Sequence, residues 1–119
     1  MGLTTQVLIV KPSRNSRRRI AVKFLIDSGA VYSLVLSDRL RKLGLKPYGR
    51  MDFSLADGTT VTREVGDAYF EFQGQRGPAP VIFGEEGDQP LLGVTTLESL
   101  GLVLDPFTRR LTPMRMVLA

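Results

Sequence analysis

The chain has 119 residues, a length that fits one folded domain, and 43% of them are hydrophobic, as in ordinary globular proteins. Cysteine and histidine are both absent, which excludes disulfides, thiol nucleophiles, Cys/His zinc sites and Ser-His-Asp triads. The formal net charge is +4, but six positive charges and no acid lie between residues 11 and 23. Any catalysis must therefore use carboxylates, Lys, Tyr, Ser or Thr.

The N-terminal part of the chain predicts a hairpin around a basic loop. Leu3, Val7 and Ile9 alternate with polar residues, and a second alternating series runs from residue 20 to 26. The basic stretch between them contains no interleaved aromatic residue that could stack on a base. We therefore favour a solvated hairpin loop at residues 11–23 and do not expect nucleic acid as a partner.

A carboxylate directly follows the second of these strands. The apolar run Phe24-Leu25-Ile26 leads into Asp27-Ser28-Gly29-Ala30, so an acid lies at the end of a strand that is otherwise built for burial. A buried carboxylate is costly unless it is paired or hydrogen-bonded. Asp27 is either a turn-capping residue or a functional acid, and this segment alone does not decide between the two.

Two segments predict short helices. Ser37 is a candidate N-cap for a helix that runs through Leu43, with Gly44 placed to end it in the left-handed conformation. Residues 95–98 have the spacing of a capping box, and Gly101 ends the second helix.

The remaining segments predict strands, which makes the fold class mainly β. Residues 51–55 and 61–65 alternate between apolar and polar, and Asp57-Gly58 between them is typical of a hairpin with a type I′ turn. Further strands are expected at residues 68–72, 81–83 and 102–104.

These motifs together resemble the retropepsin-like, single-domain aspartic proteases. Asp27-Ser28-Gly29-Ala30 matches the Asp-Ser/Thr-Gly-Ala signature of that family, and Leu91-Leu92-Gly93 matches its hydrophobic pair followed by Gly. The Asp57-Gly58 hairpin lies between the two motifs, where the family has its flap. The resemblance implies one domain over residues 1–119, with a closed, β-barrel-like acid protease fold and one or two short helices.

The chemistry of this family requires two carboxylates, because one must be ionised to activate a water while the other, protonated, polarises the peptide carbonyl. The chain contains one signature, so a homodimer would bring two copies of Asp27 together on a two-fold axis. Two carboxylic acids at such a short distance cannot both ionise readily and would share one proton. The resemblance implies that the apolar C-terminal stretch, residues 114–119, interleaves with its copy in an interface sheet.

The resemblance also implies the roles of other residues. Those expected to support the catalytic Asp27 are Ser28, Gly29 and Ala30. Those expected to bind the substrate are Asp57, Gly58, Leu92 and Gly93. Val31 and Tyr32 stand where retroviral members carry acids that hold the substrate backbone, so the cleavage specificity of those members does not transfer.

The leading hypothesis is therefore an aspartic endopeptidase that acts on peptides or proteins. One alternative is a catalytically silent retropepsin-like dimer that binds peptides or partner proteins, and another is a small β-barrel that binds nucleic acid through residues 11–23. The acidic loop 84–88 lacks the ligand spacing of a calcium loop, so a solvated turn is favoured and no metal or cofactor is expected. Since the sequence contains neither a membrane-length apolar run nor a secretory signal, we expect a cytoplasmic protein without membrane contact.

Overall fold

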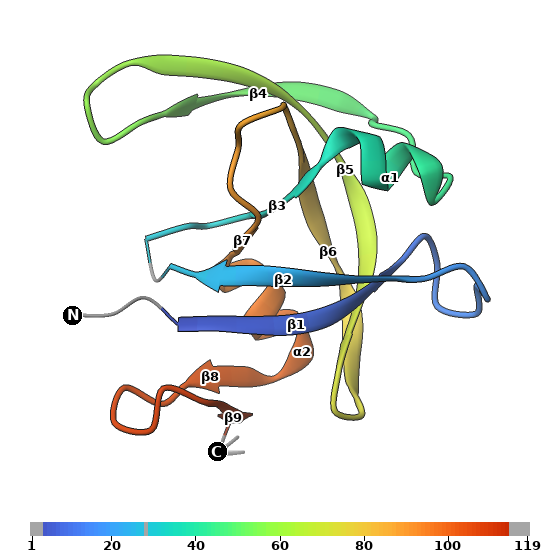
Figure 1. Cartoon of the computed structure of the whole chain (residues 1–119), viewed down its shortest axis with the longest axis vertical. Coiled ribbons are helices and arrows are strands. Elements are labelled where there is room, and N and C mark those ends of the chain that lie inside the picture. Colours follow the sequence, from blue (N-terminus) through green and yellow to red (C-terminus); the bar gives the residue numbers. More distant parts are fainter. Residues whose placement is uncertain (1–3, 28, 115–119) are drawn as a thin grey trace, which may run out of the picture.

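The computed structural model describes residues 4–27 and 29–114, and the fold is mainly β, as predicted (Figure 1). The strands are β1 (Thr4–Lys11), β2 (Ile20–Ile26), β3 (Ser33–Leu36), β4 (Gly49–Ser54), β5 (Thr60–Phe72), β6 (Gln75–Gly84), β7 (Leu91–Leu92), β8 (Leu102–Leu104) and β9 (Leu111–Pro113). The helices are α1 (Ser37–Lys42) and α2 (Val94–Leu100). Among the described residues, none of the helices is long and apolar enough to cross a membrane.

Seven of the described strands form one curled sheet, in the order β1-β2-β7-β3-β6-β5-β4. β1 also pairs with β5, so the sheet bends round until its first strand meets its sixth. The other two described strands, β8 and β9, form a small antiparallel sheet of their own after α2. β4 and the first half of β5 extend beyond the rest of the sheet as a projecting hairpin (Figure 1).

The predicted hairpin of β1 and β2 is confirmed, but Val7 of the alternating series in β1 does not face the core. Leu8 and Val10 are buried, whereas Val7 is 53% exposed. Residues 7–10 of β1 are all apolar, so the pairing of β1 with its neighbours decides which side of the strand faces the core. Leu8 lies opposite the buried Val22 of β2. Leu3 lies outside the described residues.

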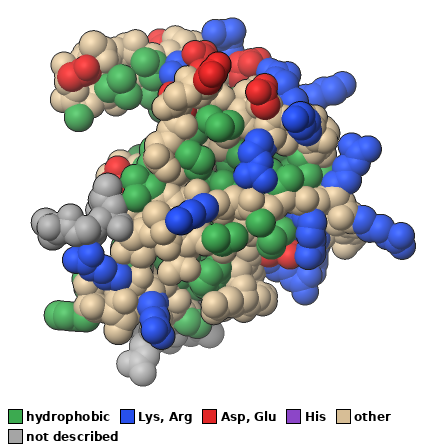
Figure 2. Space-filling view, viewed as in Figure 1, with side chains coloured by type: hydrophobic (Ala, Val, Ile, Leu, Met, Phe, Trp, Pro, Cys, Tyr) green, Lys and Arg blue, Asp and Glu red, His purple; other side chains and the backbone are tan. Residues whose placement is uncertain are grey.

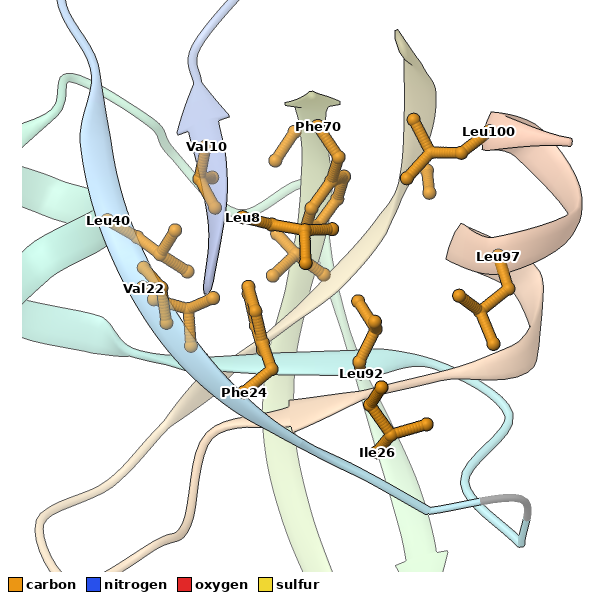
Figure 3. Packing of buried hydrophobic residues seen from close by; sticks show 14 of the residues in the cluster. Leu8, Val10, Val22, Phe24, Ile26, Leu40, Phe70, Leu92, Leu97 and Leu100 are labelled. Carbon is orange, nitrogen blue, oxygen red and sulfur yellow. The ribbon is translucent and has the colours of Figure 1, made fainter. Parts of the chain in front are cut away.

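The core fills the inside of the curled sheet (Figure 3). The rings of Phe24 on β2 and Phe70 on β5 pack at 6.2 Å between centroids, and both are fully buried. Leu40 of α1 and Leu97 of α2 close the core from two sides. Full burial of each such side chain stabilises the fold by about 1.5–3 kcal/mol.

Lys11 differs from the other cations of the predicted basic loop. Its side chain is buried, and its Nζ lies 3.0 Å from a carboxylate oxygen of Glu71 and donates a hydrogen bond to the carbonyl oxygen of Arg14. The prediction that the whole basic stretch is solvated is therefore wrong at this residue, because β1 and β5 pair beside it and supply the acid.

Helix α1 ends as predicted but begins differently. Gly44 has a φ of 97°, the left-handed conformation that the sequence indicated. The N-cap, however, is Leu36, and no side chain caps the helix. The hydroxyl of Ser37 instead accepts a hydrogen bond from Nε of Arg41, so the prediction of a Ser37 cap is wrong.

Helix α2 likewise ends at the expected glycine, Gly101, with a φ of 68°. The capping box predicted at residues 95–98 is wrong, because the helix begins at Val94 with Gly93 as its N-cap. The hydroxyl of Thr96 points into the protein, where it meets Ser33.

The projecting β4–β5 hairpin confirms the strands expected on either side of Asp57, but its turn is not type I′. Only Gly58 has a positive φ, of 88°, whereas a type I′ turn needs two such residues. Oδ1 of Asp57 accepts hydrogen bonds from the backbone N–H and the hydroxyl of Thr59, which lowers the pKa of Asp57. These bonds hold a longer turn in which the N–H of Leu55 donates to the carbonyl oxygen of Thr59.

Candidate active site

Asp27 is the first residue beyond β2, and its carboxylate is exposed. The strand before it is fixed on both sides, by β1 and by the parallel pairing of Ile26 with Leu92 on β7. Oδ1 of Asp27 accepts a hydrogen bond of 2.9 Å from the N–H of Gly29, and the N–H of Ala30 donates to the Asp27 carbonyl oxygen at 3.0 Å. The turn after the strand therefore orients the carboxylate towards solvent.

Ser28 lies outside the described residues, so its supporting role stays a prediction. In the described part of the chain, Oδ2 of Asp27 has no hydrogen-bond partner, in contrast to Oδ1. One carboxylate oxygen is thus held by the turn, and the other is available to a water or a second carboxylate.

The loop that follows Asp27 is fastened to the start of α2. The N–H groups of Val94 and Thr95 donate to the carbonyl oxygens of Ala30 and Val31, at 2.9 and 3.0 Å. These bonds satisfy N–H groups of the first helical turn, which have no partner within the helix. The loop after Asp27 and the beginning of α2 therefore form one unit.

Gly93 makes this close approach possible. A Cβ at Gly93 would overlap the carbonyl carbon of Tyr32 and would lie 2.6 Å from the carbonyl oxygen of Val31. Its N–H donates to the hydroxyl of Ser33 at 2.9 Å. Only a residue without a side chain fits here.

Leu92 and Gly93 do not line the groove described below, so their contact with substrate stays a prediction. Leu92 is fully buried in the core, and Gly93 is buried against the 30–33 backbone. The second motif therefore supports the site from behind.

A groove of about 410 Å³ opens beside the Asp27 loop and beneath the projecting hairpin. Figure 2 shows this hairpin overhanging a hollow on the left side of the molecule. The lining is largely apolar and includes Val31, Tyr32, Phe53, Leu55, Val61 and Ile82, together with Gly29 and Ala30 of the signature. Asp57 and Gly58 are exposed at the hairpin tip and outside the groove wall, so their contact with substrate stays a prediction.

An aromatic pair joins the hairpin to the loop after Asp27. The ring of Phe53 on β4 meets the ring of Tyr32 edge-on, with 6.5 Å between centroids. Such pairs contribute about 0.5–1.5 kcal/mol beyond the area that they bury. The contact holds the hairpin over the groove at a point five residues after Asp27.

An ion pair forms the polar part of the groove wall. Nε of Arg63 lies 2.9 Å from Oδ2 of Asp88, and Nη2 lies 3.3 Å from Oδ1. The guanidinium holds the pKa of Asp88 below its ordinary value, and the carboxylate raises the pKa of Arg63. No group of acids in the described ranges is placed to hold a metal ion.

This pair was not expected from the sequence. The expected solvated turn at residues 84–88 is right for the exposed residues 85–87 but wrong for Gly84, which is buried at the end of β6, and for Asp88, which is half-buried. Arg63 could have indicated such a pair from the sequence. It alternates with polar residues, on the same face of the strand as the apolar Val61 and Val65, and a charge on a face that points inward requires a partner.

The comparisons with known proteins agree with the motifs. A family model described as aspartyl protease matches residues 15–96, most of the chain, and the chain belongs to this family of aspartyl proteases. The predicted relation to the retropepsin-like proteases is thereby confirmed.

The solution structure of a simian foamy virus (mac) protease has a similar fold. It superposes with a TM-score of 0.52 at 22% sequence identity, covering 78% of this chain and 92% of the viral chain. No curated protein matches the sequence.

Proposed function

We propose that this protein is an aspartic endopeptidase whose active site consists of two Asp27 carboxylates from two copies of the chain. The observation that carries the proposal is the exposed carboxylate of Asp27, which lies beside an apolar groove lined by Gly29 and Ala30. One oxygen of this carboxylate is held by the turn, and the other is free of partners among the described residues. Membership in the aspartyl protease family supports the same chemistry.

In the proposed reaction, an ionised Asp27 removes a proton from a water, and the oxygen of that water attacks the peptide carbonyl carbon. The protonated Asp27 of the second copy donates a hydrogen bond to the carbonyl oxygen and stabilises the tetrahedral intermediate. Collapse of the intermediate breaks the C–N bond, and a carboxyl proton passes to the leaving amine. Each turnover therefore consumes one water and returns the carboxylate pair to its starting state.

The need for two chains follows from the chemistry, because each chain supplies one signature carboxylate. The β8–β9 unit offers a surface for the second copy: Val103 is 40% exposed and Phe107, in the turn between the two strands, is 95% exposed. The β4–β5 hairpin is called the flap below. Its tip lies on the same side of the molecule as the β8–β9 turn and the loop at residue 27 (Figure 1). Residues 115–119 lie outside the described residues, so their part in an interface sheet stays a prediction.

The groove indicates how a substrate would bind. Its apolar lining and its position beneath the flap suit an extended peptide with hydrophobic side chains, and the exposed backbone at Gly29 lies beside the carboxylate. We propose that residues 1–119 act as a single protease domain, with Gly29 and Ala30 supporting Asp27.

The test is cleavage of an unstructured protein mixture between about pH 4 and 7, a range suited to a carboxylate pair that shares one proton. Wild type is compared with Asp27→Asn and with Asp38→Asn, which removes an exposed carboxylate on α1. We expect Asp27→Asn to abolish cleavage and a statine-type inhibitor to block it in wild type, while Asp38→Asn retains activity.

Sedimentation of the same proteins measures the dimer separately from the chemistry. Cleavage by Asp27→Asn at the wild-type rate would overturn the proposal. Wild type that is inert but dimeric would instead favour the alternative in which the fold binds peptides without hydrolysing them.

A further inference from the structure

The cations of this protein are distributed unevenly along the chain and over its surface. Residues 1–46 contain ten of the 16 Lys and Arg residues but two of the 12 acids, which gives this part a net charge of +8. Residues 47–119 contain the other six cations and ten acids, a net charge of −4. The overall value of +4 therefore hides a strongly polarised molecule.

The fold joins two basic segments that are separate in sequence. Nη2 of Arg39, on α1, donates a hydrogen bond of 3.1 Å to the carbonyl oxygen of Ala21 on β2. Arg18 reaches the other end of α1, where its Nη1 would lie 3.3 Å from a Cβ at Gly44. The loop between β1 and β2 thus lies against α1, and their cations form a single surface.

This surface, called the basic face below, consists of eight exposed side chains. They are Arg14, Arg17, Arg18 and Arg19 of the loop, and Arg39, Arg41, Lys42 and Lys46 of α1 and the segment after it. Figure 2 shows blue side chains gathered along the right side of the molecule, over the region of this loop and α1 in Figure 1.

Few acids neutralise the basic face. Arg41 pairs with Glu64 at 2.7 Å, and Arg19 lies 3.7 Å from Glu71, which Lys11 also contacts. The members without an ion pair to a described residue are Arg14, Arg17, Arg18, Arg39, Lys42 and Lys46. The face therefore retains a concentrated positive field.

The basic face lies away from the candidate active site. β2 runs from the basic loop at Ile20 to the carboxylate that follows Ile26, a length of about 23 Å at ~3.3 Å per residue. The tip of the β4–β5 hairpin and the loop after Asp27 lie at the far end of this strand (Figure 1). Gly29 and Ala30 of this loop line the groove. The two surfaces can be occupied at the same time.

Residues 11–23 by themselves did not lead us to expect nucleic acid, but the fold adds the cations of α1 to those of the loop. We propose that the resulting basic face binds the phosphate backbone of a nucleic acid duplex. Six of its eight cations are arginines, whose planar guanidinium groups bind phosphate oxygens in pairs. The loop projects from the sheet and can follow a groove between two phosphate strands (Figure 1). No exposed aromatic residue lies in the loop or in α1, and the exposed Tyr48, two residues after Lys46, is hydrogen-bonded to Asp67. One aromatic ring cannot stack on a run of unpaired bases, so a duplex is favoured over a single strand.

The composition of the face argues against other polyanions. None of the exposed large hydrophobic side chains of the described residues lies in the 12–19 loop or in α1. Membrane-surface segments insert apolar side chains, and protein interfaces depend on buried apolar anchors. A surface that offers only charged side chains suits the regular row of phosphates in a nucleic acid, and it would bind without preference for the base sequence.

The experiment measures fluorescence anisotropy of a labelled duplex of about 20 base pairs, at a series of salt concentrations from about 50 mM upwards. Three double variants remove the same charge: Arg17→Gln with Arg18→Gln, Lys42→Gln with Lys46→Gln, and, as the control outside the face, Arg76→Gln with Arg110→Gln. All six side chains are exposed, so each variant is expected to melt within a few degrees of wild type.

Wild type is expected to bind the duplex at low salt, with log Kd rising by about 0.9 per phosphate contact for each unit of log salt. Each variant of the basic face should lower that slope by roughly 1.5–2, while the control keeps the wild-type slope. The absence of duplex binding at the lowest salt, or an equal loss in the control, would overturn the proposal. So would tighter binding of poly-glutamate or of phosphatidylserine vesicles with the same dependence on the basic face, since the partner would then be of another class.

Discussion

The hydroxyl groups of Ser33 and Thr96 meet at 2.5 Å inside the protein, although 63 positions separate them in the chain. Both side chains are fully buried. Ser33 Oγ also accepts a hydrogen bond from the N–H of Gly93, so one serine links β3, the Leu91-Leu92-Gly93 motif and α2 directly behind the loop that follows Asp27.

Replacement of these two hydroxyls should destabilise the protein unequally. Ser33→Ala removes the acceptor of Gly93 and the partner of Thr96, whereas Thr96→Val leaves the Ser33–Gly93 bond intact. Each orphaned buried polar group costs about 1–3 kcal/mol, so urea unfolding should show the larger loss for Ser33→Ala. A larger loss for Thr96→Val would contradict this account.

Gly93→Ala should be among the most damaging single substitutions. The new Cβ would meet backbone atoms of Val31 and Tyr32, which cannot rotate away as a side chain can. We expect a loss of about 1–3 kcal/mol or more in the free energy of unfolding. Gly49→Ala is the matched control, because a Cβ at Gly49 meets nothing within 4 Å, and its stability should stay close to that of wild type.

The Tyr32–Phe53 pair predicts an effect on substrate binding, provided that the protein is the proposed peptidase. Phe53→Ala removes the contact that holds the flap over the groove, and a pair worth about 0.5–1.5 kcal/mol corresponds to a roughly 2- to 12-fold fall in kcat/KM. Met51→Ala, an exposed change on the same strand and outside the groove lining, should leave kcat/KM unchanged. Equal losses in the two variants would show that the pair has no special role.

The Arg63–Asp88 pair predicts a dependence of stability on pH. Because Arg63 lowers the pKa of Asp88 in the folded protein, the unfolded chain takes up a proton more readily. The stabilisation is complete above the unfolded pKa of about 3.9 and is lost as the pH falls below that value towards the folded pKa.

Asp88→Asn should therefore be less stable than wild type by roughly 1–2 kcal/mol near neutral pH, and the difference should shrink below about pH 4. Thermal melts at a series of pH values measure this. Glu86→Gln, an exposed change in the same turn, should follow the wild-type profile, and a constant gap for Asp88→Asn across the whole range would argue against the mechanism.

Local patterns in the sequence were enough to identify several features. Glycines with positive φ were found at Gly44 and Gly101, because only a residue without Cβ adopts this conformation readily. The signature at residues 27–30 and the hairpin around Asp57 were also found, since turn chemistry and period-two alternation depend on neighbouring residues. The mainly β class and the protease family follow from these short-range signals.

Long-range pairing decided the rest. Val7, Leu8, Ile9 and Val10 are all apolar, so only the pairing of β1 with β2 and β5 determined that Leu8 and Val10 face the core. The hairpin of β1 and β2 was correctly expected. The packing of its loop against α1, which forms the basic face, depends on how the chain folds back on itself. The sequence by itself determines the identity and local spacing of the side chains. The partner of a buried hydroxyl, carboxylate or cation is determined only when distant segments pack together, because a buried polar group needs a hydrogen-bond or ion-pair partner in the folded protein.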